Sequence, residues 1–523
     1  MHPLIYLLVI TAYINISMNH CLIFGVTNGG IFRATGAHRI ANHLRLQGWD
    51  CEVVDFIEYW SFDQIKELLL SRVNENTKFF GFSITFNLTK NEQLLLNLVN
   101  WAKEKWPNLK FISGGHSVPF FPAPFDYHIM SYAEFALDEL LKWLFSNGVT
   151  PVFDPLLKKG NMEVINATVH LPSHPFPEAV IKYEPRDFMT PTDHGVIEFS
   201  RGCIFQCKFC NFPVLGVRGD YTRSAESVYE QMMFNYDNYG VQDYGVSDET
   251  FNDRTEKIAK FADVVEKLPW KPYFSAFIRA DLLISRPRDR EELLRLGLHA
   301  HLYGIESFNA QSLKYIGKGM APDRLKEGLI DVRNYFKKHI GHRFRASINL
   351  IAGLPHETLE TMEETCQWIH KNWLDQTVTC QPLRINKDDE PRPSIVDESY
   401  DTLGYIEMTP EEQYAAINSR DGEAWVHLEY GHFELLERNR IWKNEHMNWY
   451  QAVSYSAKIN GGGKKFGNIE KVYPLHMPLV YSDKFGNILT TDEKLKLYGK
   501  KTREAEEGAR VYIQNYISKK LSL

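Results

Sequence analysis

The stretch RGCIFQCKFCNF, residues 201–212, places Cys203, Cys207 and Cys210 in a C-x-x-x-C-x-x-C pattern. These three thiols are nearly half of the seven cysteines in a chain of 523 residues. A disulfide framework is an awkward explanation because three is an odd number. Thiolates this close together usually hold a metal. The stretch therefore predicts a metal-binding loop.

Zinc and an iron–sulfur cluster are the two candidates for this loop. A structural zinc site takes four ligands, commonly as two spaced pairs. The other cysteines, Cys21, Cys51, Cys366 and Cys380, are scattered singly, and His194 lies upstream without regular spacing to the thiols. A cluster held by three thiolates leaves one iron open, and an open coordination position is typical of a catalytic metal. The pattern favours a 4Fe-4S cluster, with zinc binding as the alternative.

The three-cysteine pattern, with Phe209 directly before the last thiol, resembles the signature of the radical S-adenosylmethionine (SAM) superfamily. The resemblance implies a 4Fe-4S cluster on Cys203, Cys207 and Cys210, and SAM as a second cofactor bound through the open iron. It further implies that one electron from the cluster cleaves SAM to a 5′-deoxyadenosyl radical. A reductant such as a flavodoxin or ferredoxin is the implied partner.

Length and composition set broad limits. A chain of 523 residues is too long for one ordinary core, so two or three domains are expected. Hydrophobic residues at 44% and charged residues at 24% are typical of a soluble globular protein. The net charge of −7 makes a nucleic-acid substrate unlikely, because such proteins carry basic patches. Few, unpaired cysteines favour a reducing, cytoplasmic location.

The first residues contain an apolar run, LIYLLVITAYINI, at positions 4–16. The run is shorter than the roughly 20 residues that span a bilayer, so no membrane span is expected. It lacks the basic start and the small-residue cleavage site of a signal peptide. We interpret residues 1–17 as an extra strand or an overextended start, with Met18 as the initiator.

Residues 18–147 alternate between unbroken apolar strands and amphipathic helices. Strands are expected at 21–26, 51–56, 78–84, 110–115 and 127–131, and helices at 34–47, 62–73, 94–105 and 133–145. Continuous apolar strands between helices indicate a parallel sheet covered on both faces. The expected fold is a Rossmann-like doubly wound α/β domain, whose ligands bind beyond the carboxyl ends of its strands.

The loops after these strands resemble those of the cobalamin-binding domain that precedes many radical SAM barrels. The resemblance makes cobalamin a candidate cofactor and implies that these loops would contact it. The family's D-x-H-x-x-G motif is missing, since the corresponding loop reads NGGIFRATG, and His38 and His116 are stray histidines. Relatives without that histidine bind cobalamin with no lower ligand, so cobalamin stays open. The candidate loop residues are Asn28, Gly29, Gly30, Ser83, Gly114 and Gly115.

A proline-rich linker is expected at 148–195, followed by a second α/β domain at 196–385. Strands are expected at 195–200, 244–251, 271–280, 299–307, 344–353 and 377–385, with helices at 224–236, 289–296, 323–337 and 359–371 among them. Six strand–helix units predict a partial, TIM-like (βα)6 barrel. Such a barrel places its functional residues at the carboxyl ends of its strands.

Polar residues occur at these strand ends. Asp248 and Glu249 could accept hydrogen bonds from the SAM ammonium, and Arg279 could pair with the SAM carboxylate. Glu306 suits ribose hydroxyls, and Ser347 is a further candidate. The alternative is that such residues merely cap strands and helices. The motifs DETF, IRADLL, GIES and GLPHET resemble the corresponding stations of cobalamin-associated radical SAM enzymes, which favours the cofactor roles.

Residues 386–523 are expected to form a mainly helical, substrate-facing region, with KDDEPRP and GGGKK separating its segments. Helices are expected at 410–418, 434–449 and 492–519. Only Cys366 and Cys380 follow the three-cysteine loop, which are too few for the auxiliary cluster that some radical SAM relatives carry. The leading hypothesis is a radical SAM enzyme, and a cobalamin-dependent methyltransferase of an unactivated carbon if cobalamin binds. The alternatives are a rearrangement or ring-forming radical SAM enzyme without cobalamin, or a non-catalytic zinc protein. The sequence leaves the substrate unknown.

Overall fold

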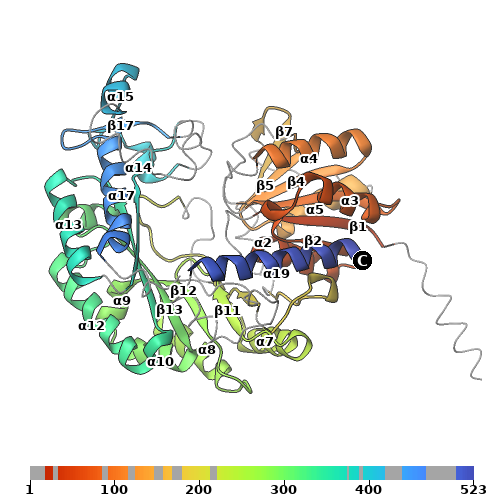
Figure 1. Cartoon of the computed structure of the whole chain (residues 1–523), viewed down its shortest axis with the longest axis horizontal. Coiled ribbons are helices and arrows are strands. Elements are labelled where there is room, and N and C mark those ends of the chain that lie inside the picture. Colours follow the sequence, from red (N-terminus) through yellow and green to blue (C-terminus); the bar gives the residue numbers. More distant parts are fainter. Residues whose placement is uncertain are drawn as a thin grey trace, which may run out of the picture.

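The computed structural model describes residues 18–26, 33–84, 92–115, 124–146, 157–167, 180–191, 193–211, 221–373, 376–387, 393–417, 439–466 and 502–523. Within these residues, two parallel sheets form the centres of two α/β domains that lie side by side (Figure 1). The predicted fold class, a doubly wound domain followed by a partial barrel, is confirmed.

The sheet of the first domain has the strand order β2-β1-β3-β4-β5-β7-β6. Neighbours from β2 through β7 pair in parallel, and β6 pairs with β7 antiparallel. The strands are β1 (His20–Val26), β2 (Asp50–Val54), β3 (Thr77–Ile84), β4 (Lys110–Gly115), β5 (Tyr127–Met130), β6 (Leu157–Lys159) and β7 (Met162–Asn166). The helices are α2 (Thr35–Leu46), α3 (Phe62–Arg72), α4 (Glu92–Lys105) and α5 (Glu134–Phe145), with a 3-10 turn at Ile57–Tyr59.

Two hydrophobic cores flank this sheet, as expected when both faces are covered. One side of the sheet packs on α3 and α4 through residues such as Leu68 and Leu98, and the other packs on α2 and α5 through Ala41 and Leu140. Strands β6 and β7 lie inside the segment expected to be a linker, so part of that segment extends the first sheet. A 3-10 turn, Pro185–Asp187, follows before the second domain.

The second domain is a six-stranded parallel sheet with the order β15-β14-β13-β12-β11-β8, which is the sequential order of a partial barrel. Its strands are β8 (His194–Ile197), β11 (Asp243–Val246), β12 (Phe274–Ile278), β13 (Leu298–Glu306), β14 (Arg345–Ala352) and β15 (Thr377–Pro382). The helices around it are α7 (Ala225–Tyr239), α8 (Thr255–Val265), α9 (Ala280–Ser285), α10 (Arg288–Leu296), α11 (Ala310–Ile316), α12 (Pro322–Ile340) and α13 (Leu359–Asn372). A short ribbon of β9 (Ser200–Arg201) and β10 (Tyr221–Thr222) flanks the cysteine stretch.

The local sequence explains the helix boundaries. Ser224 caps α7, because its hydroxyl accepts the Ser227 N–H at 3.1 Å, and Gly240 ends the helix in the left-handed region. Thr358 forms a capping box with Thr361 at the start of α13. The four barrel helices expected from the sequence, α7, α10, α12 and α13, begin and end within a few residues of the expected positions.

The C-terminal region corrects two expectations. The helix expected at 434–449 is wrong in its described part, where Trp442–Lys443 is strand β17, paired with β16 (Ile406–Glu407), and α17 (Trp449–Phe466) begins at its end. GGGKK lies within α17 and does not separate segments. Tertiary anchoring outweighs the poor helix propensity of glycine, since Asn460 of α17 exchanges hydrogen bonds of 2.7 and 2.8 Å with the Cys380 backbone.

The remaining C-terminal helices are α14 (Ile395–Glu398), α15 (Pro410–Ile417) and α19 (Thr502–Ser522). Helix α19 returns to the first domain, where Figure 1 shows it lying across that domain. Tyr512, Ile513, Tyr516 and Ile517 join the core on the α3 side of the first sheet. The last helix is therefore structural for the first domain. Among the described residues, no helix combines the length and apolarity needed to cross a membrane.

Candidate functional site

The cysteine loop follows β9 at the carboxyl edge of the barrel. Cys203, Cys207 and Cys210 are partly buried. The Lys208 N–H donates to the Ile316 carbonyl at 3.2 Å, and the Lys208 carbonyl accepts the Val396 N–H at 3.1 Å. The loop is thus held between the end of α11 and the start of α14. Phe209 packs against the barrel core beside it.

Cationic groups surround the thiols. Arg279 Nη1 donates toward Cys207 Sγ at 3.8 Å, and Cys203 Sγ lies 3.7 Å from the Thr250 hydroxyl. Burial raises the pKa of the Cys207 thiol, while the charges of Lys318 and Arg279 act in the opposite direction. Positive charge and N–H donors favour the thiolate, which is the form that binds metal.

The thiols do not form a ready-made site for a single metal ion. Among the described residues, no group of three or more His, Cys, Asp or Glu side chains is arranged to hold one ion. In a four-iron cluster each thiolate binds a different iron, so its ligands need not converge on one point. Three thiols on one loop beside cationic groups fit such a cluster better than a compact zinc site.

Asp248 supports the strand that leads into the loop. Its carboxylate accepts the Phe199 N–H at 2.8 Å and the Ser200 hydroxyl at 2.7 Å, and the side chain is buried. Burial raises the pKa of Asp248, and Lys257 opposes that shift. Both carboxylate oxygens accept hydrogen bonds from the segment before the loop, so Asp248 supports that segment, and its contact with the SAM ammonium stays a prediction.

Glu249 lies where the two domains meet. The Tyr132 hydroxyl, just after β5 of the first domain, donates to Glu249 Oε1 at 2.8 Å. Oε2 is shielded from solvent and has no hydrogen-bond partner within the part of the chain that the structure describes. Burial raises the pKa of Glu249 to about 8. Burial therefore favours the protonated form of this carboxyl, which can donate a hydrogen bond.

The guanidinium of Arg279 contacts several groups of the protein. Its Nε and Nη2 donate to the two oxygens of Asp281 at 3.0 and 2.6 Å, and its Nη1 faces Cys207. The guanidinium also lies over the Phe205 ring, 4.0 Å from the centroid. This arrangement orients the arginine toward the thiol. The predicted fork to the SAM carboxylate would have to compete with Asp281.

Glu306 ends β13 with a backbone φ of +69°, a region that non-glycine residues rarely adopt. Its carboxylate pairs with the Lys318 ammonium at 2.9 Å. Strained positions of this kind are often found at functional sites. Lys318 also donates to the Gly304 carbonyl, which ties the end of β13 to the turn after α11.

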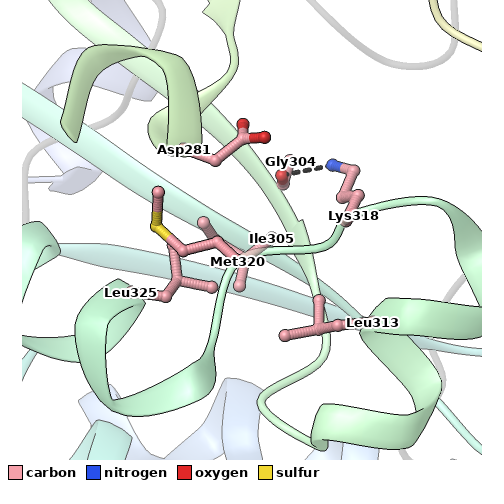
Figure 2. A pocket seen from close by; sticks show the side chains of 7 residues that line it. All are labelled: Asp281, Gly304, Ile305, Leu313, Lys318, Met320 and Leu325. Atoms are coloured by element: carbon pink, nitrogen blue, oxygen red, sulfur yellow. Dashed lines mark hydrogen bonds between the residues drawn. The ribbon is translucent and has the colours of Figure 1, made fainter. Parts of the chain in front are cut away.

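A small cavity of about 10 Å³ lies beside this ion pair. Figure 2 shows polar groups of Asp281 and Lys318 at one end of it and the apolar Met320, Leu325 and Leu313 at the other. The volume suffices for about one water molecule. This cavity is therefore too small for a molecule the size of SAM.

Some side chains on the inner face of the barrel sheet are exposed and others are buried. Ala276 and Ile278 of β12 pack into the core, so the alternation of strand residues places Phe277 on the inner face, where it is 45% exposed. By the same alternation Ser347 of β14 faces inward and is buried. Thr379 and Gln381 of β15 are exposed, on the side opposite to the buried Cys380.

The structure adds residues that the sequence did not single out. Lys318 and Arg201 both contact the site, and Glu357 is buried with its pKa raised to about 7 by burial. The Glu357 carboxylate accepts the Ser307 hydroxyl at 2.5 Å and the Gly353 N–H at 2.8 Å, which joins the ends of β13 and β14. In the sequence, Glu357 was included only as part of the motif GLPHET. Nothing local marks Lys318, because its role depends on a partner brought in by another strand.

The carboxyl edge of the first sheet is partly described. Asn28, Gly29, Gly30 and His116 lie outside the described residues, while Ser83, Gly114 and Gly115 end β3 and β4. A Cβ on Gly115 would lie 2.0 Å from the Ile84 carbonyl oxygen, so strand packing alone explains this glycine.

His38, one of the two stray histidines, is buried. Its Nε2 lies 2.8 Å from Asp55 Oδ2 and its Nδ1 lies 3.8 Å from Asp187 Oδ2. The histidine is therefore held inside the domain and does not extend from the sheet edge as a metal ligand.

The second domain matches a known protein family. Residues 197–369 match the model of the Radical SAM superfamily. The chain is 22% identical over 443 residues to the hopanoid C-3 methylase of Methylococcus capsulatus, a match that covers 82% of this chain and 79% of that protein. An uncharacterized methyltransferase of Pyrococcus horikoshii is 24% identical over 181 residues, which are 35% of this chain and 38% of that protein.

Two solved structures share the two-domain fold. TsrM from Kitasatospora setae, a methyltransferase solved with cobalamin and a 4Fe-4S cluster bound, has a TM-score of 0.57 and 14% identity over 75% of this chain and 79% of that one. OxsB, solved with aqua-cobalamin and SAM bound, has a TM-score of 0.51 and 19% identity over 74% of this chain. The match spans 55% of the OxsB chain, about half its length. At these identities the likeness is one of fold.

Proposed function

We propose, from the premise that this chain is a radical SAM enzyme, that it is a cobalamin-dependent methyltransferase acting on an unactivated carbon. One observation carries the proposal. The carboxyl edges of both sheets meet, because Tyr132 follows β5, Glu249 follows β11, and the two side chains share a hydrogen bond of 2.8 Å. Both edges are where such folds bind their ligands.

Cys203, Cys207 and Cys210 would hold the 4Fe-4S cluster. When bound, the cluster would supply the electron for reductive cleavage of SAM. Arg279 and Asp281 orient a hydrogen-bond donor toward Cys207, and Asp248 fixes the strand before the loop. Phe209 closes the loop against the core.

SAM would lie in the open mouth of the barrel, since the neighbouring closed cavity is too small for it. Glu306 and Lys318 present paired charges at its rim. The ammonium suits the SAM carboxylate, and the carboxylate suits ribose hydroxyls. Phe277, Thr379 and Gln381 line the exposed inner face and would contact the substrate.

The described part of the first sheet edge fits cobalamin without a histidine ligand. When bound, cobalamin would supply a transferable methyl group. Ser83 and Gly114 end neighbouring strands there, and His38 is committed to Asp55. The relatives support this reading, since hopanoid C-3 methylase is named for methyl transfer and TsrM was solved with cobalamin.

Anaerobic reconstitution tests the proposal. The protein should take up about four iron and four sulfide per chain, retain cobalt when produced with cobalamin, and cleave SAM on reduction. Incubation with SAM carrying a deuterated methyl group should transfer that group to an added substrate. The variant with Ala at Cys203, Cys207 and Cys210 should lose both cluster and cleavage. One zinc and no SAM turnover would refute the enzyme function.

The second candidate is a radical SAM rearrangement or ring-forming enzyme. The packing role of Gly115 favours it, because the close approach of the Ile84 carbonyl explains this glycine without a cobalamin contact. Cluster assembly and SAM cleavage without retained cobalt would select this candidate. In either case a reductant such as a flavodoxin or ferredoxin would deliver the electron.

A further inference from the structure

Four charged side chains meet where the two domains touch. Arg39 comes from α2 and Glu134 from the first turn of α5, both in the first domain. Glu198 and Arg201 come from the strand segment that leads into the cysteine loop of the barrel. Each of the four is 8% exposed or less. We call this group the interdomain ion cluster.

The interdomain ion cluster is closely paired. Arg201 donates to both oxygens of Glu134 at 2.6 and 3.1 Å and to Glu198 at 2.7 Å. Arg39 bridges the same two carboxylates from the other side. Two guanidinium groups thus face two carboxyl groups, which is the kind of pairing that buried charges require. Removing one carboxylate leaves two guanidinium groups short of a partner.

An aromatic ring completes the arrangement. The Arg201 guanidinium lies over the Tyr132 ring, 4.0 Å from its centroid, and the hydroxyl of that tyrosine donates to Glu249. A guanidinium group that donates hydrogen bonds to carboxylates in its own plane and stacks on an aromatic ring has one well-defined orientation. Arg201 is therefore fixed by first-domain groups on two sides.

The position of Arg201 connects this contact to the metal-binding loop. Arg201 lies in β9, two residues before Cys203, and is fully buried. Gly202, between them, has a φ of +91°, so the chain turns sharply directly after the anchored residue. Any shift of Arg201 would move Cys203.

We propose that the interdomain ion cluster positions the cysteine loop, and that Glu134 of the first domain is a positioning residue acting through Arg201. The inference rests on the proposed function in one respect, the binding of a 4Fe-4S cluster by that loop. It assigns the first domain a role that needs no ligand in that domain. This role is to position the segment that leads into the cysteine loop.

The test uses the full chain, reconstituted anaerobically, with the electron paramagnetic resonance spectrum of the reduced cluster as readout. Glu134→Gln removes one charge with little change of shape. It should retain iron and sulfide but give a mixture of spectra after SAM addition, and bind SAM on the order of tenfold more weakly. Glu134→Asp keeps the charge and should restore part of the single spectrum.

The matched control is Glu139→Gln, one turn further along α5, where the carboxylate is exposed and pairs with Lys142 at 3.5 Å. It should behave as the wild type. Wild-type spectra and SAM affinity in Glu134→Gln would overturn the proposal.

If Glu134→Gln does not fold, Arg201→Lys replaces it, because lysine keeps the charge but cannot form the fork. Arg201→Lys should give the same mixture of spectra, and a single wild-type spectrum from it would overturn the proposal. No readout depends on cobalamin or methyl transfer. A wild-type protein that assembles no cluster would overturn both proposals, whereas normal variants would overturn the positioning role alone.

Discussion

Glu249→Gln should make the stability of the protein less dependent on pH. Burial raises the pKa of Glu249 from 4.5 to about 8, and the nearby carboxylates of Glu198 and Asp248 add to that shift, while the Tyr132 hydroxyl opposes it. Between these two values the native carboxyl keeps a proton that the unfolded chain has lost. The native state then binds more protons, so the free energy of unfolding falls as pH rises.

The structure sets the size of the effect. Over the pH range between the two pKa values, the free energy of unfolding falls by about 1.4 kcal/mol per pH unit. A pKa that moves from 4.5 to about 8 therefore lowers the free energy of unfolding by at most roughly 5 kcal/mol, and the full loss is reached above pH 8. Glutamine has nearly the shape of a protonated glutamic acid and can still accept from Tyr132. The variant should match the wild type at pH 5 and exceed it increasingly toward pH 9.

The assay is thermal unfolding of the metal-free full-length protein across this pH range. A unit of the size of the barrel gains about 2–4 °C per kcal/mol, so the difference in unfolding midpoint at pH 9 should reach at most roughly 10–20 °C. Glu67→Gln, on the exposed face of α3, makes the same chemical change without burial and should show no such trend. A difference that is constant with pH, or that grows toward acid, would refute the assigned protonation state.

Three further predictions concern the cluster loop and the last helix. Arg279→Lys keeps the charge but loses the N–H aimed at Cys207, so the cluster midpoint potential should fall by on the order of tens of millivolts; an unchanged potential in a redox titration would contradict this role. Cys210→Ser should abolish iron uptake, whereas Cys366→Ala, at a buried thiol outside the loop, should leave iron and sulfide contents unchanged. Tyr512→Phe removes a hydroxyl that bonds to buried charges and should lower stability by about 1–3 kcal/mol; an unchanged melting midpoint would argue against a structural role for α19.

The fold could be predicted because its signals are local. Unbroken apolar strands and the helix cap at Ser224 are predicted from a few neighbouring residues, and the structure contains them. The wrong expectations concern segments whose conformation depends on contacts with residues far away in the sequence. The glycines of α17 are helical because Asn460 binds β15, a contact that no local pattern announces.

The candidate site divides in the same way. The three cysteines are adjacent in sequence, so their pattern predicted a metal loop. The partners of the strand-end residues are not adjacent. Asp281 engages Arg279 within two residues, but Lys318 reaches Glu306 from a turn beyond α11, and Arg201 meets Glu134 across 67 residues. Sequence position identified which residues lie at the strand ends, and tertiary structure determined whether they face a ligand or the protein.

Several side chains at the strand ends support the cysteine loop. Asp248 and Arg279, whose predicted contacts with SAM stay predictions, support the strand before the loop and donate toward the thiol of Cys207, respectively. Glu134 and Arg201 support the same loop from the first domain. A loop held from three directions has little freedom, which is the preorganisation that a reactive centre needs. The residues proposed to meet the substrate lie on the exposed inner face of the barrel, so substrate specificity should respond to changes at Phe277, Thr379 and Gln381 before it responds to changes around the thiols.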